Sequence, residues 1–317
     1  MTFNAVGVTW DTESYAEDLG KRNTGQNAHL EAQLIAKYPP LDIQPHLAHG
    51  ASTSTAILTS PMVVTNCKDR ILVWYLPQIL STSRQAQILA ATKSLQHVMH
   101  RPRSNGGNWR SDSAHYTMAG EFTPGQINMS AAWHRQAHET PNDLPCATPV
   151  LRMTDGPVRQ WLMEFQTTMA FLNAVLSIVH PELYAAGEKV MRHLRKDDKI
   201  EDVHEILDHW MSVFTAVSAV INRESPLHRD PKTCKSWYDM MLTVGQYQEA
   251  ILELSTFGVR LLYNARTVIC ISGKLVRHGV SEIESGDRIV YSFYMRESVH
   301  QFCSVPLATW MHYSRWS

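Results

Sequence analysis

The chain has 317 residues, a net charge of −1 and a hydrophobic content of 44%, so it is long and apolar enough to bury a full core. This nearly neutral net charge excludes the class of proteins that bind nucleic acid through an overall positive charge. Any contact with DNA must therefore come from a local patch of basic residues. Five cysteines without a CxxC motif predict neither a zinc module nor a disulfide framework.

The pattern of polarity divides the chain into four expected parts. The first is polar and weakly periodic, which predicts a partly irregular arm. Helical and strand-like periodicities then alternate before a strand-rich segment begins. We therefore expect an N-terminal arm over residues 1–68, an α/β flank over 69–204, a β-barrel core over 205–300 and a C-terminal extension over 301–317.

Three elements of the flank have clear boundaries in the sequence. The apolar run Ile71–Leu76 predicts a strand, and a helix is expected to begin at Ser83. Apolar residues then recur every three or four positions after Pro157, a residue that favours the first turn of a helix, until Pro181 stops the pattern. This longer helix is expected to pack against the outside of the barrel.

The segment Arg101–Phe122 lies between these two helices and has no periodicity. It contains paired glycines, two asparagines and three arginines, Arg110 among them. The arginines could contact phosphates, while Asn105 and Asn108 could hydrogen-bond an extruded base. The segment is therefore either a substrate loop or an ordinary solvent loop.

From Trp210 onward the chain consists of short runs rich in Val, Ile, Tyr, Phe and Thr, interrupted by Gly, Pro, Asn and Ser. This texture is typical of a many-stranded barrel or jelly roll. The predicted fold class is therefore α+β, a double-stranded β-helix (jelly-roll) barrel with flanking helices.

Two histidines and an aspartate in this segment have the spacing of an open iron site. His228 and Asp230 form an HxD pair, and His278 follows after several predicted strands, at an expected strand end. Two histidines and one carboxylate bind one face of non-haem Fe(II) and leave the other face for a co-substrate and O₂. The spacing therefore predicts that these three residues are catalytic Fe(II) ligands.

Arg288 is the candidate clamp for 2-oxoglutarate, because it follows His278 by ten residues and opens a predicted strand. The keto acid end of 2-oxoglutarate can chelate iron, and its other carboxylate needs a bidentate cationic partner. Arg260 and Arg277 are the alternative clamps. Strand alternation puts one set of side chains on a common face that would look into the barrel: Arg288, Val290, Ser292, Tyr294 and Arg296.

The same segment resembles the TET/J-binding-protein family of nucleic-acid dioxygenases, especially its fungal branch. The resemblance covers roughly residues 205–300 and is carried by NRESPLHRD, YDMMLTVGQY, LELSTFGVRLLYNARTVICISGKLVRHGV and GDRIVYSFYMRESV. Asn222, six residues before the first ligand, belongs to this texture. One departure is Ala265-Arg266, where the family commonly has Pro-Gly in a turn.

This resemblance implies Fe(II) on the three ligands, 2-oxoglutarate on the clamp, and a methylated base flipped into the barrel mouth. In relatives the residue eight positions after the clamp contacts the base, and this position is Arg296 here. An aspartate three residues after the carboxylate ligand also touches the base, but Thr233 stands there and the nearest acid is Asp239. The candidate substrate-binding residues are therefore Asn105, Asn108, Asn222, Asp239 and Arg296.

The expected activity is that of a 2-oxoglutarate- and Fe(II)-dependent dioxygenase acting on DNA with methylated bases. The preferred substrate is 5-methylcytosine, oxidised to 5-hydroxymethylcytosine and further products, with N6-methyladenine as another candidate. Two alternatives are a 2-oxoglutarate oxygenase acting on protein or a small molecule, and a non-catalytic barrel used for binding. No signal peptide or membrane span stands out, so we expect a soluble, monomeric, nuclear protein.

Overall fold

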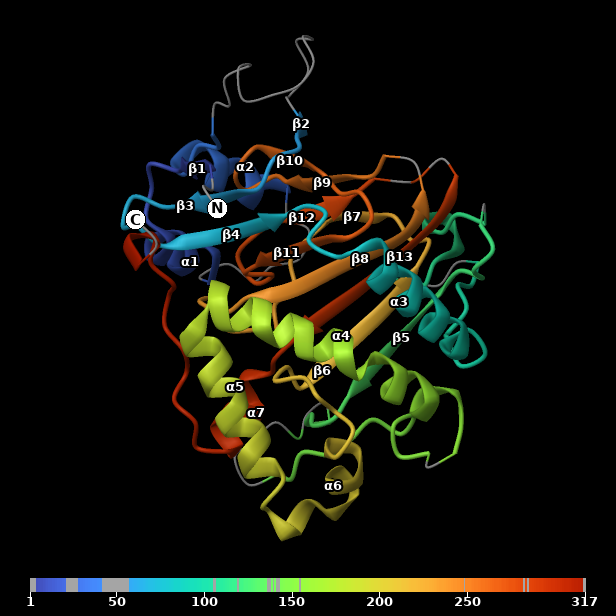
Figure 1. The fold of residues 1–317 in the computed structure, drawn as a ribbon. Coiled ribbons are helices and arrows are strands. Elements are labelled where there is room, and N and C mark those ends of the chain that lie inside the picture. The colour runs from blue at the N-terminus through green and yellow to red at the C-terminus, as the bar shows by residue number, and fades with distance from the viewer. Residues whose placement is uncertain are drawn as a thin grey trace.

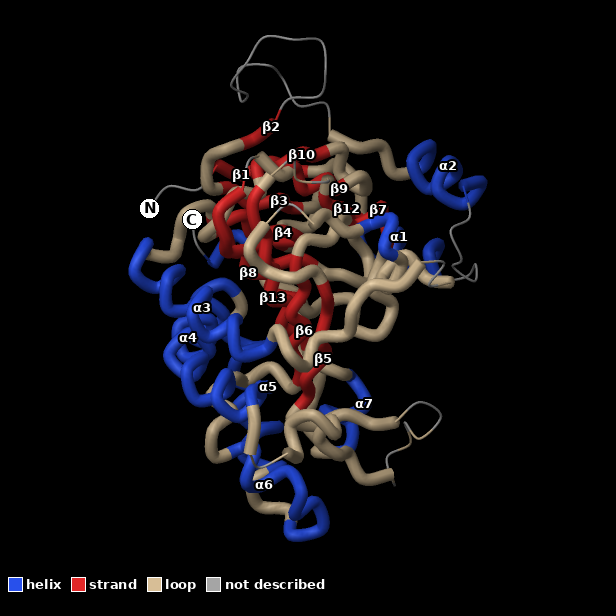
Figure 2. The backbone as a smooth tube through the Cα atoms, turned by 90° about the vertical axis from the view of Figure 1, so that its right-hand side faces the viewer, coloured by secondary structure: helices blue, strands red, loops and turns tan. Residues whose placement is uncertain are grey.

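Two β-sheets face each other in this protein, and most helices cover the outer side of the larger sheet (Figures 1 and 2). This arrangement is a double-stranded β-helix with flanking helices, so the predicted α+β class is confirmed. The structure is a computed structural model, and it describes residues 4–315 except for 21–27, 42–56, 105–106, 119, 136–137, 139, 141–142, 154, 248, 282 and 284.

The larger sheet has the strand order β1-β3-β4-β11-β8-β13-β6-β5, with all neighbours antiparallel except β1 and β3. The predicted strand Ile71–Leu76 is confirmed as β4. Four strands of this sheet precede residue 205, so the sheet extends beyond the range expected for the barrel. The bounds are β1 Asn4–Gly7, β3 Met62–Thr65, β4 Ile71–Leu76, β5 Gly125–Ser130, β6 Ala216–Ile221, β8 Asp239–Tyr247, β11 Thr267–Ile271 and β13 Gly286–Tyr294.

The smaller sheet has the order β2-β10-β9-β12-β7 and carries both candidate histidine ligands. His228 ends β7, whereas His278 begins β12. The expectation that His278 ends a strand was therefore wrong, because the preceding residues form a turn that leads into the strand. The bounds are β2 Ile57–Leu58, β7 Ser225–His228, β9 Ile251–Leu254, β10 Val259–Leu262 and β12 His278–Val280.

Side chains along β13 point alternately to the two faces of the larger sheet, so one face packs in the core and the other lines a cavity. Tyr291 and Phe293 are fully buried under the helices, where Trp161 and Phe165 lie 6.0 and 4.5 Å from the Tyr291 ring. The intervening side chains face the other sheet. The covering helices are α3 Thr82–Leu95, α4 Pro157–Val179 and α5 Pro181–Leu194, with α6 Glu201–Leu207 and α7 Glu297–Phe302 near them (Figure 1).

Helix α4 confirms the predicted boundaries, since it begins at Pro157 and ends just before Pro181. It is long and apolar enough, by length and composition alone, to cross a membrane, with a mean hydropathy of 1.4 over its most apolar window. Its buried residues recur at helical spacing and join the main core cluster. Because this stripe packs against the sheet, α4 has the character of a core helix.

The N-terminal part contains two helices that weak periodicity did not predict: α1 Thr12–Gly20 and α2 Ala28–Lys37. Few of their residues are buried, so each helix has only a narrow apolar stripe. Trp10 stacks on Tyr15 at 5.0 Å and on Phe257 of the barrel at 5.9 Å. These contacts dock the helices on the smaller sheet.

The turn in which this chain departs from the TET/J-binding-protein pattern has an unusual backbone. Arg266 has φ of 71°, in the left-handed region that glycine adopts most readily. Its amide donates to the Thr243 carbonyl of β8 at 2.7 Å, which holds this turn just before the start of β11. Arg266 therefore adopts, at a position where the family commonly has glycine, a backbone conformation that glycine adopts more readily than arginine.

His180 links α4 to α5 in its neutral form. Its Nδ1 accepts a hydrogen bond from the Leu183 amide at 3.3 Å, and its Nε2 lies 3.3 Å from the Ser236 carbonyl. Burial lowers the pKa of His180 to about 4. The stabilisation from the neutral form is therefore complete above the unfolded pKa of about 6.5 and is lost as the pH falls toward 4.

We expect the unfolding free energy of His180→Gln to decrease less than that of the wild type between pH 6.5 and 4.5, because glutamine does not titrate. The wild-type protein should lose up to about 1.4 kcal/mol more per pH unit in this window than the variant does. Urea denaturation of both proteins across this range measures the difference. If the unfolding free energy fell equally with pH in both proteins, the assignment of His180 as a buried neutral histidine would be contradicted.

Candidate metal centre and co-substrate cavity

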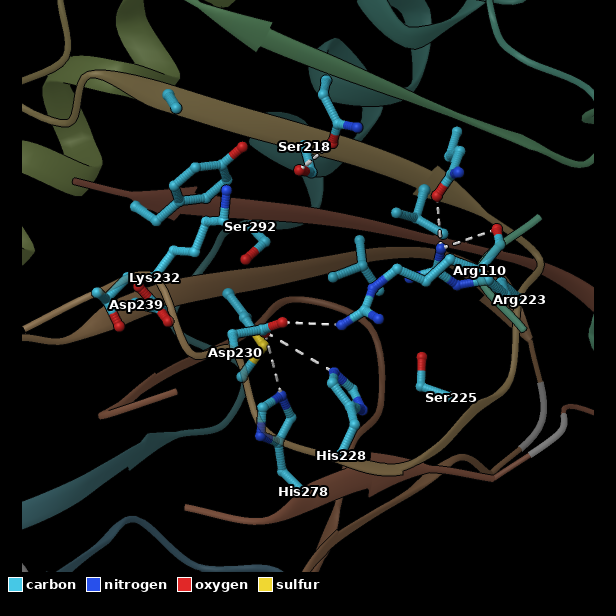
Figure 3. Close-up of a pocket in the computed structure, with 18 of the residues that line it drawn as sticks. Arg110, Ser218, Arg223, Ser225, His228, Asp230, Lys232, Asp239, His278 and Ser292 are labelled. Carbon is cyan, nitrogen blue, oxygen red and sulfur yellow. Dashed lines mark hydrogen bonds and ion pairs between the residues drawn. The ribbon is translucent and has the colours of Figure 1, made fainter. Parts of the chain in front are cut away.

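The smaller sheet and the segment that follows β7 bring His228, Asp230 and His278 together in a cavity between the two sheets (Figure 3). His228 on β7 pairs directly with His278 on β12. The Nε2 atoms of these histidines lie 3.7 and 3.8 Å from Asp230 Oδ2. One ligand atom from each residue falls within 4.8 Å of the others, so a single ion could be held between them.

Backbone carbonyls fix the orientation of both imidazoles. His228 Nδ1 lies 2.7 Å from the Pro226 carbonyl, and His278 Nδ1 lies 2.9 Å from the Val276 carbonyl. A carbonyl can only accept, so Nδ1 carries a proton in each ring, and in the neutral form of each ring Nε2 presents a lone pair. Burial, followed by the proximity of His228, lowers the pKa of His278 to about 4 and keeps the ring of His278 neutral. Two neutral imidazoles and one carboxylate fit Fe(II).

Asp230 is held on both sides, although its side chain is 45% exposed toward the cavity. Its amide donates to the Gly273 carbonyl at 2.8 Å, and its Oδ1 accepts from Arg110 at 2.9 Å. Burial opposes ionisation, but the adjacent His228, His278 and Arg110 side chains hold the pKa of Asp230 well below its usual range. The carboxylate is therefore ionised, with Oδ2 directed toward the histidines.

The loop Arg101–Phe122 contacts this centre through residues that the sequence did not single out for that purpose. Trp109 lies 4.7 Å from the His228 ring, and Arg110 stacks on Trp109 at 4.3 Å. The phosphate role expected for Arg110 therefore competes with its ion pair to Asp230. Asn108 is exposed, does not line the cavity and accepts from the Arg110 amide, and its contact with a base stays a prediction. Asn105 lies outside the described residues.

We expect Arg110→Gln to weaken Fe(II) binding about tenfold, because partners of metal ligands typically contribute 10–100-fold to affinity. The substitution removes the charge that orients Asp230 Oδ1 while keeping a hydrogen-bonding side chain. Anaerobic calorimetric titration with Fe(II) measures the change. Arg103→Gln is the matched control, since Arg103 lies in the same loop outside the cavity. Equal losses in both variants would contradict a specific role for Arg110.

Arg288 lies deep in the cavity as a buried cation, with 3% of its surface exposed. Its guanidinium donates to the Arg223 carbonyl, but no carboxylate within the described part of the chain forms an ion pair with it, and its Nε has no partner. The Tyr263 hydroxyl, which also lines the cavity, likewise lacks a partner among the described residues. A buried arginine without an acidic partner and a buried hydroxyl without a hydrogen-bond partner, both at one cavity, can bind a carboxylate.

This geometry distinguishes Arg288 from the alternative clamps. Arg260 on β10 and Arg277 before β12 do not line the cavity. Tyr263, by contrast, was missed by the sequence reasoning, since a tyrosine after a short strand carries no signal of its own. Only the closure of the barrel places Tyr263 beside Arg288.

The cavity has a volume of 610 Å³ and runs along β13 from Arg288 toward Arg296. The predicted common face is confirmed, because all five alternating side chains from Arg288 to Arg296 line the cavity. Five cationic side chains and two carboxylates surround it: Arg110, Arg223, Lys232, Arg288 and Arg296, with Asp230 and Asp239. The cavity is therefore locally positive in a chain of net charge −1.

Asp239 lines the cavity near Asp230 and is 6% exposed. Its Oδ1 has no hydrogen-bond partner in the parts of the chain that the structure describes. Burial, followed by the charge of Asp230, raises the pKa of Asp239 well above its usual range. A protonated Asp239 could both donate to and accept from a ligand in the cavity.

Asn222 lies behind the cavity, so its expected substrate contact is corrected to a role in the fold. It is 1% exposed with φ of 54° and does not line the cavity. Its amide group donates to Asp287 Oδ1 at 2.8 Å and accepts from the Arg288 amide at 2.8 Å. Asn222 therefore holds the start of β13, from which Arg288 projects.

Residues 130–297 match the Tet_JBP family model, described as the oxygenase domain of the 2OGFeDO superfamily, that is, of 2-oxoglutarate- and Fe(II)-dependent dioxygenases. This match covers more than half of the chain. Among curated proteins, none matches this chain.

Several solved structures are similar to this protein at low sequence identity. NgTET1 in complex with 5mC DNA has a TM-score of 0.49 and 14% identity, covering 86% of this chain and 92% of that one. A 2OG-Fe(II) oxygenase family oxidoreductase from Burkholderia pseudomallei has a TM-score of 0.32 and 13% identity, covering 71% and 86%. The collagen prolyl hydroxylase of Paramecium Bursaria Chlorella virus-1, in a 2OG complex, has a TM-score of 0.22 and 17% identity, covering 26% and 59%.

Proposed function

Because the chain belongs to the Tet_JBP family of 2-oxoglutarate- and Fe(II)-dependent dioxygenases, we propose that it oxidises the methyl group of methylated bases in DNA. The main substrate that we propose is 5-methylcytosine, converted to 5-hydroxymethylcytosine and further products, with N6-methyladenine as a further candidate. The family assignment makes the chain an enzyme that uses iron and 2-oxoglutarate, and the alternative of a non-catalytic barrel is not retained.

In this proposal Fe(II) is held by His228, Asp230 and His278. Iron and 2-oxoglutarate supply the oxidation when bound: one atom of O₂ enters the substrate C–H bond, and the other enters succinate as CO₂ leaves. The chain's own residues provide the geometry. The histidines present oriented lone pairs, and Asp230 supplies the only negative charge among the ligands.

Arg288 and Tyr263 bind the distal carboxylate of 2-oxoglutarate in this account. The observation that carries the proposal is a buried arginine without an acidic partner in the same cavity as the three ligands. A buried cation is costly unless an anion compensates it, so the site is built for a dianion that reaches from Arg288 to the metal.

The DNA part of the proposal is supported by the family and by the charge around the cavity. A polyanion is attracted by the five cationic side chains at and beside the cavity, even though the whole chain is nearly neutral. We also propose that the enzyme is monomeric. Because methylated genomic DNA is the proposed substrate, we also propose a nuclear location.

Asp239 and Arg296 are the proposed contacts to the base. Asp239→Ala should reduce oxidised base formed per 2-oxoglutarate consumed by about tenfold, since one lost contact to a polar edge typically costs 1–2 kcal/mol. The release of succinate without substrate should stay near the wild-type rate, because the metal ligands remain intact. Parallel assays of succinate and oxidised nucleoside separate these quantities, and an unchanged ratio would remove Asp239 from the base site.

Mass spectrometry of nucleosides tests the proposed function. Duplexes of one sequence carrying 5-methylcytosine, N6-methyladenine or no methyl group are incubated with protein, Fe(II), 2-oxoglutarate and O₂. We expect 5-hydroxymethylcytosine from the first duplex and no product without 2-oxoglutarate. Turnover of 2-oxoglutarate without oxidation of either base would favour a protein or small-molecule substrate instead.

A further inference from the structure

Arg229 stands between the ligands His228 and Asp230 in sequence but has no place in the cavity. Its side chain is 13% exposed and contacts the N-terminal helices instead. Residues 228–235, which begin with the first ligand, are called the metal loop below. Arg229 thus joins the metal loop to a part of the chain nearly 200 residues away.

Four hydrogen bonds hold the Arg229 guanidinium. Two go to the Glu31 carboxylate of α2, at 2.5 and 3.1 Å, and one goes to the Tyr15 hydroxyl of α1, at 2.7 Å. The fourth goes from Nε to the Leu275 carbonyl at 3.0 Å. Because Leu275 lies three residues before His278, one guanidinium ties both ligand-bearing segments to each other and to the helices.

The helices that hold Arg229 are themselves anchored. Tyr15 packs edge-on against Tyr38 at 5.2 Å and stacks on Trp10, within the aromatic group that docks on the barrel. Glu13 of α1 forms an ion pair with Lys235, farther along the metal loop. Glu31 and Glu13 therefore contact the metal loop on either side of its turn, at Arg229 and Lys235.

We propose that Glu31 and Tyr15, acting through Arg229, position His228, Asp230 and His278 for metal binding. The bidentate guanidinium–carboxylate pair fixes direction as well as distance, and the three ligands must converge within a few ångströms. Glu31, Tyr15 and Arg229 are positioning residues, since none of them touches the cavity. This inference rests on the proposed function, which assigns the three ligands to iron.

The test is anaerobic titration of the full chain with Fe(II), combined with thermal unfolding of the metal-free protein. Glu31→Gln should weaken Fe(II) binding about tenfold, as expected for the loss of a partner that orients ligands. Tyr15→Phe keeps the ring packing and removes one hydrogen bond, so it should cause a smaller loss. Glu205→Gln is the matched control, because it removes an Arg–Glu ion pair with Arg159 on the helical side.

A double exchange, Glu31→Arg with Arg229→Glu, should recover part of the lost affinity, which a general loss of stability would not allow. Unchanged Fe(II) affinity in Glu31→Gln and Tyr15→Phe, beside normal binding by the wild type, would overturn this inference alone. A lower unfolding temperature with unchanged affinity would have the same consequence, since it assigns Glu31 to the fold only. A wild-type protein that binds no Fe(II) would overturn the proposed function and this inference together.

Discussion

Asp230→Ala should abolish the consumption of 2-oxoglutarate while leaving the protein folded. The substitution removes the one anionic ligand, and two neutral imidazoles alone hold Fe(II) weakly. The fold should survive because the Asp230 side chain is 45% exposed and its ion-pair partner Arg110 is 36% exposed. Pairs with this exposure contribute about 1 kcal/mol or less to stability.

The measurement for this variant is succinate formation at saturating Fe(II) and 2-oxoglutarate, together with a thermal unfolding curve. Asp155→Ala is the matched control, since Asp155 is an exposed aspartate just before α4. It should keep wild-type turnover. A folded Asp230→Ala protein that retained most of its turnover would remove the carboxylate from the metal centre.

Arg288→Lys should raise the KM for 2-oxoglutarate more than tenfold, a loss above about 1.4 kcal/mol. Lysine keeps the positive charge but cannot form two parallel hydrogen bonds with a carboxylate. At saturating 2-oxoglutarate much of the turnover should return, because the metal ligands and the base contacts are unchanged.

Arg260→Lys and Arg277→Lys are the controls for this prediction, as both arginines belong to the barrel but lie outside the cavity. Initial rates over a range of 2-oxoglutarate concentrations give the KM of each variant. If the KM rose in a control and stayed constant in Arg288→Lys, the distal carboxylate would have to bind elsewhere.

Periodicity and spacing predicted those features that depend on the local chain. Pro157 and Pro181 mark the ends of α4, and alternation predicted which side chains of β13 face the cavity. The spacing of His228, Asp230 and His278 likewise predicted residues that the structure brings together. Each of these signals lies within one element or in a short motif at the end of one.

Features that depend on long-range contacts could not be read from the sequence. Tyr263 faces Arg288 only after the barrel closes, and Arg110 reaches Asp230 across 120 positions. Tyr263 was missed, whereas Asn222 was wrongly expected to contact the substrate because of its position before the first ligand. Its positive φ and its hydrogen bonds to the start of β13 place it behind the cavity instead. Spacing along a chain predicts proximity, but not the side from which a residue approaches.

The central claim is that one cavity couples the oxidation of 2-oxoglutarate to a methylated base in DNA, and the most direct test is the stoichiometry of that coupling. Succinate and oxidised nucleoside are measured in the same reaction, with a 5-methylcytosine duplex and an unmethylated duplex of identical sequence. We predict faster succinate formation with the methylated duplex, in a ratio of about one succinate per oxidation event, as the balance of the reaction requires. Equal succinate formation with both duplexes, and no oxidised base, would contradict the account.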